Sequence, residues 1–203
     1  GGGDVQFYAS SWKVFGTTHD CIGLAKMELL PGVYTFHMSY EGATQQKNSW
    51  DVDASPEVIF QTKLVTVEFT DSEGGPLEGL VQYYASGWKT FGTTSPCDGT
   101  ATKEILPGVY SFHMSYGGAA QQKNSINIDV LGPLVQFQTQ KMVVEFIDSN
   151  GDPLSGGTVH YYASGWNLVG DTDGAGLATV ELLPGTYSFL MGWAGAWKQI
   201  SIV

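Results

Sequence analysis

Apolar and polar residues alternate along many short segments of the chain, which is the pattern of β-strands that bury one face. In the segment 33–40, for example, Tyr34, Phe36, Met38 and Tyr40 fall on one face, which we assign to the core. Glycine, proline and aspartate stand between the alternating segments, where tight turns favour them. No segment shows a convincing helical period, so the sequence predicts an all-β protein.

One block of the sequence occurs three times. The copy Val81–Tyr116 is repeated as Val5–Tyr40 and, more loosely, as Val159–Trp193, so that successive copies start 76 and 78 residues apart. A repeat of roughly 77 residues is too long for one rung of a solenoid and suits a small independent domain. We therefore expect three tandem units: unit 1 (1–62), unit 2 (63–140) and unit 3 (141–203).

Unit 2 is the only unit in which every strand of a small sandwich is predicted. Its seven predicted strands are 64–69, 81–85, 88–92, 101–106, 109–116, 122–130 and 134–139. Seven short strands with turn residues between them are typical of an antiparallel β-sandwich of immunoglobulin size. The strand at 64–69 could pair within its own unit or complete unit 1, and the hairpin-like turn that follows it favours the first alternative.

The two outer units are incomplete versions of unit 2. Unit 1 contains predicted strands at 24–30 and 57–62, but it has no counterpart of 64–69. Unit 3 has no counterpart of 134–139. An incomplete sandwich exposes strand edges, and a strand from another molecule can complete such an edge. If residues 1–203 are the mature subunit, we therefore expect self-association, end to end, into a filament or array. The alternative is that the two ends reflect proteolysis.

The units are joined without flexible spacers. The last strand of one unit leads directly into the first strand of the next at 60–69 and at 137–146, with no linker rich in glycine, serine or proline. The sequence therefore predicts stiff coupling between neighbouring units.

The charge balance limits the partners of this chain. It has 9 basic and 20 acidic residues, which give a formal net charge of −11. Such a surface repels phosphate backbones and anionic lipid headgroups, so we expect no nucleic-acid binding and no attachment to a membrane surface. No apolar run approaches the ~18 residues that cross a bilayer, so membrane insertion is not expected either.

Residues with catalytic potential are scattered along the chain. His37 and His113 are copies of one outward-facing position, which is occupied by Leu190 in unit 3. Nucleophilic catalysis needs a base held beside the nucleophile, and the sequence indicates no such pair. We therefore expect no enzyme activity, no catalytic residue and no cofactor.

One turn has the spacing of a calcium loop. Asp148, Asn150 and Asp152 carry side-chain oxygens at positions i, i+2 and i+4. The same residue types also form an ordinary hairpin turn, and we favour that interpretation.

Pairs of aromatic residues recur in successive units. The pairs are Tyr8 and Trp12, Tyr84 and Trp88, and Tyr162 and Trp166. Exposed rings at a fixed spacing could stack on sugar faces and form a platform for a polysaccharide. They could also pack against a neighbouring unit or subunit, or cover the edge of the sandwich. We favour this interface role, because large exposed apolar patches usually mark interfaces.

The two cysteines, Cys21 and Cys97, occupy the same loop of successive units. A disulfide needs Cα atoms within about 7 Å, which equivalent loops of a linear array do not meet unless the units fold back on each other. A small side chain inherited by duplication is the simpler interpretation. A bridge between neighbouring domains or between chains is the alternative.

The turn and strand pattern at 148–156 (DSNGDPLSG) and 172–189 (TDGAGLATVELLPGTYSF) resembles the prealbumin-like sandwiches of bacterial surface proteins. These include Cna-B-type repeats and carboxypeptidase-regulatory-like domains. The resemblance implies three tandem Ig-like or prealbumin-like antiparallel β-sandwich repeats, the outer two incomplete, in an extracellular and non-catalytic module. We expect a structural repeat protein of an extracellular fibre or a cell-surface adhesin stalk. A carbohydrate-binding array is the alternative.

Overall fold

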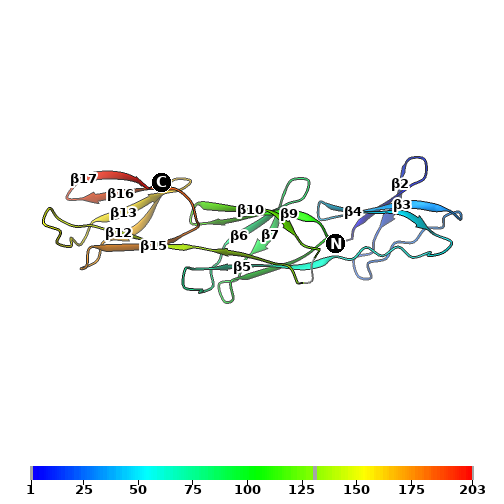
Figure 1. Ribbon diagram of the computed structural model, residues 1–203, viewed down its shortest axis with the longest axis horizontal. Coiled ribbons are helices and arrows are strands. Elements are labelled where there is room, and N and C mark those ends of the chain that lie inside the picture. Colours follow the sequence, from blue (N-terminus) through cyan, green and yellow to red (C-terminus); the bar gives the residue numbers. More distant parts are fainter. Residues whose placement is uncertain (1, 130–131, 203) are drawn as a thin grey trace.

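The computed structural model describes residues 2–129 and 132–202 and contains 17 β-strands joined by turns and loops. The strands form three groups that follow one another along the long axis of the molecule (Figure 1). The all-β prediction is confirmed, because the described residues form no helix. It follows that this part of the chain has no helix able to cross a membrane. Val130, which ends the predicted strand 122–130, lies outside the described residues.

Unit 2 is a sandwich of two sheets. Its strands are β5 (Lys63–Thr70), β6 (Leu80–Tyr84), β7 (Trp88–Thr93), β8 (Thr100–Ile105), β9 (Val109–Tyr116), β10 (Ala119–Asn127) and β11 (Leu134–Gln138). One sheet has the order β10-β9-β6-β7 and the other the order β11-β5-β8. All seven predicted strands are confirmed. β5 pairs antiparallel with β8 and parallel with β11, so it belongs to its own unit, and the β11–β5 pair departs from the antiparallel pattern.

The four-stranded sheet recurs in the other two units. In unit 1 it has the order β2-β1-β3-β4, with β1 (Asp4–Tyr8), β2 (Trp12–Thr17), β3 (Val33–Tyr40) and β4 (Ala43–Asp51). In unit 3 it has the order β14-β13-β16-β17, with β13 (Thr158–Tyr162), β14 (Trp166–Asp171), β16 (Tyr187–Trp193) and β17 (Ala196–Ile202). The second sheet of unit 3 consists of β12 (Gln140–Glu145) and β15 (Leu177–Leu182).

The core of unit 2 lies between its two sheets. Val65, Val67 and Phe69 alternate along β5, and each is 0 % exposed. They belong to one apolar cluster with Tyr83 and Phe112 of the opposite sheet, which are also fully buried. Burial of large apolar side chains is the dominant favourable term in folding, so the sandwich depends on the three fully buried side chains that β5 contributes.

The strands predicted at 24–30 and 57–62 of unit 1 are wrong, because neither segment forms a strand. Their counterparts in unit 2 are β8 and β11, and both of these hydrogen-bond to β5. Unit 1 has no strand at the place of β5 within the described residues. Without this central strand, the two segments share no partner to which their backbone groups could bond, so their alternating pattern alone does not make them a sheet.

The same difference appears in side-chain burial. Leu106, which directly follows β8, is 2 % exposed, whereas its counterpart Leu30 is 80 % exposed. Phe137 of β11 is buried, whereas its counterpart Phe60 is only partly buried. Equivalent residues therefore stabilise unit 2 far more than unit 1.

Truncation of these two phenylalanines should separate the two units. We expect Phe137→Ala to lower the opening free energy of the second sheet of unit 2 by about 3–5 kcal/mol, the cost of emptying a packed aromatic site. Phe60→Ala, its matched control, should have a clearly smaller effect on unit 1, because that ring is partly in solvent. Native-state hydrogen exchange measures both values, and equal losses would contradict the difference in packing.

Candidate functional site

Neighbouring units are joined by hydrogen bonds and by an ion pair. β11 ends at Gln138 and β12 begins at Gln140, so one residue separates the last strand of unit 2 from the first strand of unit 3. That residue, Thr139, is 2 % exposed, and its amide donates a 3.0 Å hydrogen bond to the carbonyl of Thr70. The connection is therefore a continuous, hydrogen-bonded strand path.

A buried tyrosine hydroxyl links the four-stranded sheets of neighbouring units. The Tyr83 hydroxyl of unit 2 donates to the carbonyl of Glu41 in unit 1 at 2.8 Å. Its counterpart Tyr161 in unit 3 donates to the carbonyl of Gly117 in unit 2 at 2.6 Å. Burial, reinforced by the negative charge of Glu41, raises the pKa of Tyr83 to about 12, so the phenol remains a neutral donor. The same contact is thus made at both joints.

The acceptor carbonyls lie at the tips of two-residue hairpins. Glu41 and Gly42 have φ angles of 52° and 80°, and Gly117 and Gly118 have φ angles of 55° and 73°. Two consecutive positive φ angles are typical of the tight turn that suits the twist of a β-hairpin. At both tips a carbonyl of this turn accepts a hydrogen bond from the next unit.

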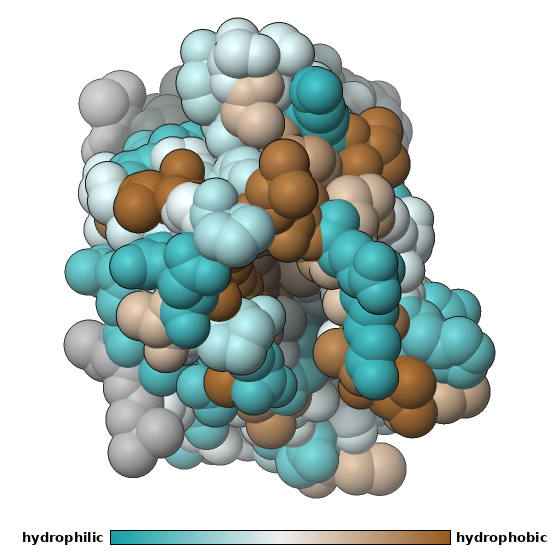
Figure 2. Space-filling view, turned by 90° about the vertical axis from the view of Figure 1, so that its right-hand side faces the viewer, coloured by the Kyte–Doolittle hydropathy of each residue, from teal (hydrophilic) through white to brown (hydrophobic). Residues whose placement is uncertain are grey.

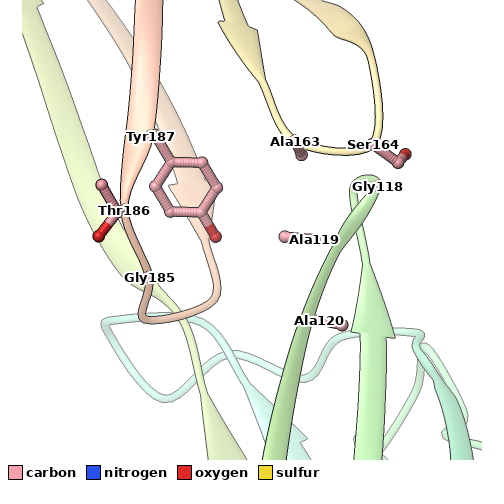
Figure 3. A pocket seen from close by; sticks show the side chains of 8 residues that line it. All are labelled: Gly118, Ala119, Ala120, Ala163, Ser164, Gly185, Thr186 and Tyr187. Atoms are coloured by element: carbon pink, nitrogen blue, oxygen red, sulfur yellow. The ribbon is translucent and has the colours of Figure 1, made fainter. Parts of the chain in front are cut away.

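The hairpin tip meets the turn between the first two strands of the next unit's sheet. The Ser86 hydroxyl donates to the Gly42 carbonyl at 3.1 Å, and the Ser164 amide donates to the Gly118 carbonyl at 3.1 Å. Figure 3 shows Ala163 and Ser164 directly above Gly118. A Cβ atom at Gly118 would lie 3.0 Å from the Ser164 hydroxyl oxygen, so glycine is needed for this approach as well as for the turn.

An open cleft runs beside this joint. Its lining residues are Gly118, Ala119, Ala120, Ala163, Ser164, Gly185, Thr186 and Tyr187. In Figure 3, the Tyr187 ring stands on the opposite side from Ala119. The Tyr187 hydroxyl is already bonded to the carbonyl of Leu183 at 2.6 Å. The lining contains no carboxylate, amine, imidazole or thiol, so it provides no pair of groups for acid–base chemistry.

A second contact links units 2 and 3 on the side of the smaller sheets. The Glu181 carboxylate of β15 accepts hydrogen bonds from the hydroxyl of Ser72 at 2.5 Å, from the amide of Ser72 at 3.2 Å and from the hydroxyl of Thr139 at 2.5 Å. Burial raises the pKa of Glu181, but these hydrogen bonds to its charged form outweigh burial and lower the pKa overall. Units 1 and 2 are linked instead by an ion pair between Lys103 and Glu41 at 3.1 Å.

The predicted aromatic pairs are exposed and contact each other within each unit. Their six members, Tyr8, Trp12, Tyr84, Trp88, Tyr162 and Trp166, are 42–51 % exposed. The ring centroids of each pair lie 5.3–5.5 Å apart with the planes at 70–76°, an edge-to-face contact across the hairpin. Trp12 and Trp88 also contact His37 and His113. Because the two rings of a pair are not coplanar, only one of them could lie flat on a sugar; polysaccharide binding stays a prediction.

Asp148, Asn150 and Asp152 lie in one turn whose geometry is that of a capped hairpin. The Asp148 carboxylate accepts hydrogen bonds from the backbone amides of Asp152 at 2.9 Å and Asn150 at 2.8 Å, which lower its pKa. Asp71 of unit 2 accepts the amides of Glu73 and Gly75 in the same way, although Gly75 has no side chain to offer a cation. Among the described residues, no group of three or more His, Cys, Asp or Glu side chains could hold a metal ion.

Cys21 and Cys97 are both exposed free thiols. The structure therefore forms no bridge between the neighbouring domains, and pairing between chains stays a prediction.

The joint residues are those that sequence reasoning missed. Tyr83 and Tyr161 occupy inward-facing positions, where unit 1 has Phe7. A tyrosine in a buried position usually has a hydrogen-bond partner for its hydroxyl, so the change from phenylalanine to tyrosine was the available signal. Glu181 gave no such signal, because a glutamate on an outward strand position is ordinary.

Comparison with known proteins gives a distant likeness only. No protein-family model and no curated protein matches the chain. Among solved structures, the Bacillus anthracis TIE protein is 15% identical, with a TM-score of 0.30 over 99% of this chain and 44% of that one. A streptococcal ancillary pilin is 13% identical, with a TM-score of 0.30 over 95% of this chain and 78% of that one. The shaft pilin SpaA of Lactobacillus rhamnosus GG is 12% identical, with a TM-score of 0.29 over 69% of this chain and 93% of that one.

This chain thus spans less than half the length of the first of these structures. Likeness at this level leaves its function to be inferred from its own residues.

The turn at Asp148 allows a direct test of the calcium hypothesis. Asp148→Ala removes the acceptor of two backbone amides, and we expect the unfolding midpoint of unit 3 to fall by about 2–4 °C. Asp152→Ala is the matched control and should leave the midpoint unchanged, as should addition of a chelator. A midpoint that falls with the chelator in the parent protein would restore the calcium interpretation.

The Glu181 contact should depend on pH. The pKa of Glu181 is lowered from its ordinary 4.5, so its contribution to the joint is complete above that value and is lost as the pH falls through the lowered pKa. We expect the Ser72 amide resonance to shift over this acid range. In Glu181→Gln the shift should disappear, and its persistence there would assign it to another group.

Proposed function

We propose that this chain is a structural segment of an extracellular fibre or a surface adhesin stalk, in which β-sandwich units are coupled into a stiff rod. The observation that carries the proposal is the repeated joint, because Tyr83 and Tyr161 bond to equivalent hairpin carbonyls of the preceding unit. A contact that recurs at both junctions is typical of units built to keep a fixed orientation to their neighbours.

The joint between units 2 and 3 restrains motion in both layers. Tyr161 and Ser164 hold the hairpin tip at the four-stranded sheets, and Glu181 holds Ser72 at the smaller sheets. Bending toward either layer must break one of these contacts. The single residue between β11 and β12 adds no length in which a bend could form. Stiffness of this kind suits a spacer that carries load or holds another domain away from a surface.

End-to-end association by strand complementation is the finer part of this proposal. β5 pairs with strands on both its edges, whereas β12 pairs only with β15 among the strands that the structure describes. In unit 1 the counterparts of β8 and β11 have no strand partner within the described residues. Strand edges of this kind pair readily with another polypeptide, and an extracellular fibre is the assembly that such contacts build.

Substitution of one joint glycine tests the stiffness. Gly118→Ala should loosen the orientation of unit 3 relative to unit 2, because a Cβ atom there would press on Ser164. Gly195→Ala is the matched control. Gly195 lies at the equivalent hairpin tip, its φ of 80° imposes a similar strain of about 1–2 kcal/mol, and nothing lies within 4 Å of its added Cβ.

Residual dipolar couplings measure the result. A rigid parent protein gives one alignment tensor for units 2 and 3, and we expect Gly195→Ala to preserve it. Gly118→Ala should give two tensors of different magnitude. Independent tensors in the parent protein itself would overturn the proposal of a stiff rod.

A further inference from the structure

We infer that unit 1 is an acceptor for one extended strand with the side-chain pattern of β5, inserted between the segments 24–30 and 57–62. The inference deepens the proposed strand complementation by naming the strand that fits. It starts from the internal comparison: unit 2 shows the same two elements, β8 and β11, with β5 hydrogen-bonded between them.

The backbone of both segments is free to receive a strand. Within the described residues, the amides of residues 25–30 and 57–62 donate no hydrogen bond to another backbone carbonyl. In unit 2 the counterparts of these amides belong to the ladders that β8 and β11 form with β5. A row of unpaired backbone groups is a template for an added strand.

The side chains of the same region expose apolar surface. Ile22, Leu24, Met27, Leu30 and Ile59 are between 42 % and 80 % exposed. Figure 2 views the end of the molecule that unit 1 forms, and apolar side chains there surround a hollow. A cleft at the joint between units 1 and 2 is lined by Gln45, Lys47, Ile59 and Gln61 of unit 1 and by Lys63 and Pro107 of unit 2.

The comparison with units 2 and 3 specifies an aromatic residue at the end of the strand. Phe69 of β5 packs edge-to-face on Tyr116 at 5.1 Å and lies against Gly79. Phe146 packs on Trp193 at 5.7 Å and lies against Gly157 in the same way.

Unit 1 retains the residues that receive this ring. Tyr40 stands at the position of Tyr116, and Gly3 stands at the position of Gly79. Met38, like its counterpart Met114, lies against that glycine. We therefore expect a phenylalanine here, two residues after a β-branched one.

The ladder of unit 2 fixes the register. Val65, Val67 and Phe69 of β5 pair with Lys103, Ala101 and Phe137 respectively. The corresponding residues of unit 1 are Met27, Ala25 and Phe60. The inserted strand therefore runs antiparallel to 24–30 and parallel to 57–62, with its three inward side chains opposite these residues.

A serine in the turn after the inserted strand would also complete the first joint. Ser72 follows β5 and bonds to Glu181 of unit 3. Glu104 of unit 2 is the counterpart of Glu181, is exposed, and makes no side-chain hydrogen bond within the described residues. A strand followed by Asp-Ser would place its serine beside Glu104, so the joint between units 1 and 2 would gain the contact that units 2 and 3 already have.

A peptide with the sequence of Leu64–Asp71, LVTVEFTD, is the probe. We expect it to slow hydrogen exchange at residues 24–30 and 57–62 of the parent protein, by about tenfold at a concentration ten times its dissociation constant. A control peptide with serine at the three inward positions should have no effect. In a second arm, residues 64–76 are fused to the N-terminus, and the same amides should be protected without added peptide.

The fused arm also tests the joint. Glu104→Gln in the fused protein should expose the amide of the copied serine, while the protection of residues 24–30 persists. Exchange that is unchanged in both arms would overturn the inference. The inference would also be overturned if the exchange protection of residues 24–30 and 57–62 grew with protein concentration and did not change when the peptide was added. Another surface of a second copy would then cover the site. The stiffness test on units 2 and 3 does not depend on either outcome.

Discussion

Pairing of one central strand on both of its edges is the interaction on which the rest of this structure depends. β5 brings β8 and β11 into one sheet, and its Val65, Val67 and Phe69 are fully buried in the core between this sheet and the opposite one. In the described part of unit 1, which contains no such strand, segments with the same pattern form no sheet and leave leucine side chains in solvent. Strand propensity is therefore expressed only when a partner satisfies the backbone.

The joints between units also depend on hydrogen-bonding groups that need a partner. A hairpin tip must leave carbonyls unpaired, and the neighbouring unit supplies a buried hydroxyl at 2.6–2.8 Å to bond them. Ser72 lies in the turn after β5, and its hydroxyl donates a hydrogen bond to the Glu181 carboxylate of the next unit. Each unit therefore satisfies groups that its neighbour cannot satisfy alone, which couples the orientation of one unit to the fold of the next.

The alternation of apolar and polar residues predicted most of the strands but few of the contacts between units. The seven strands of unit 2 were predictable because each alternates over five to nine residues and ends at a turn residue. The segments 24–30 and 57–62 carry the same alternation, and their failure to pair depends on a distant strand that no local window contains. At the joints, the replacement of Phe7 by Tyr83 and Tyr161 was a visible signal, whereas Glu181 looked like any exposed strand residue.

The sequence by itself determined the all-β class, the repetition of one block of strands and the inward faces of those strands, because these follow from the order of residues along the chain. Only the tertiary structure decided that β5 lies between one antiparallel and one parallel neighbour, that the aromatic pairs contact each other edge-to-face, and that Asp148 caps its own turn. The physical reason is that backbone pairing and side-chain contacts join residues tens of positions apart. Their partners are fixed by the three-dimensional path of the chain, which a local pattern does not encode.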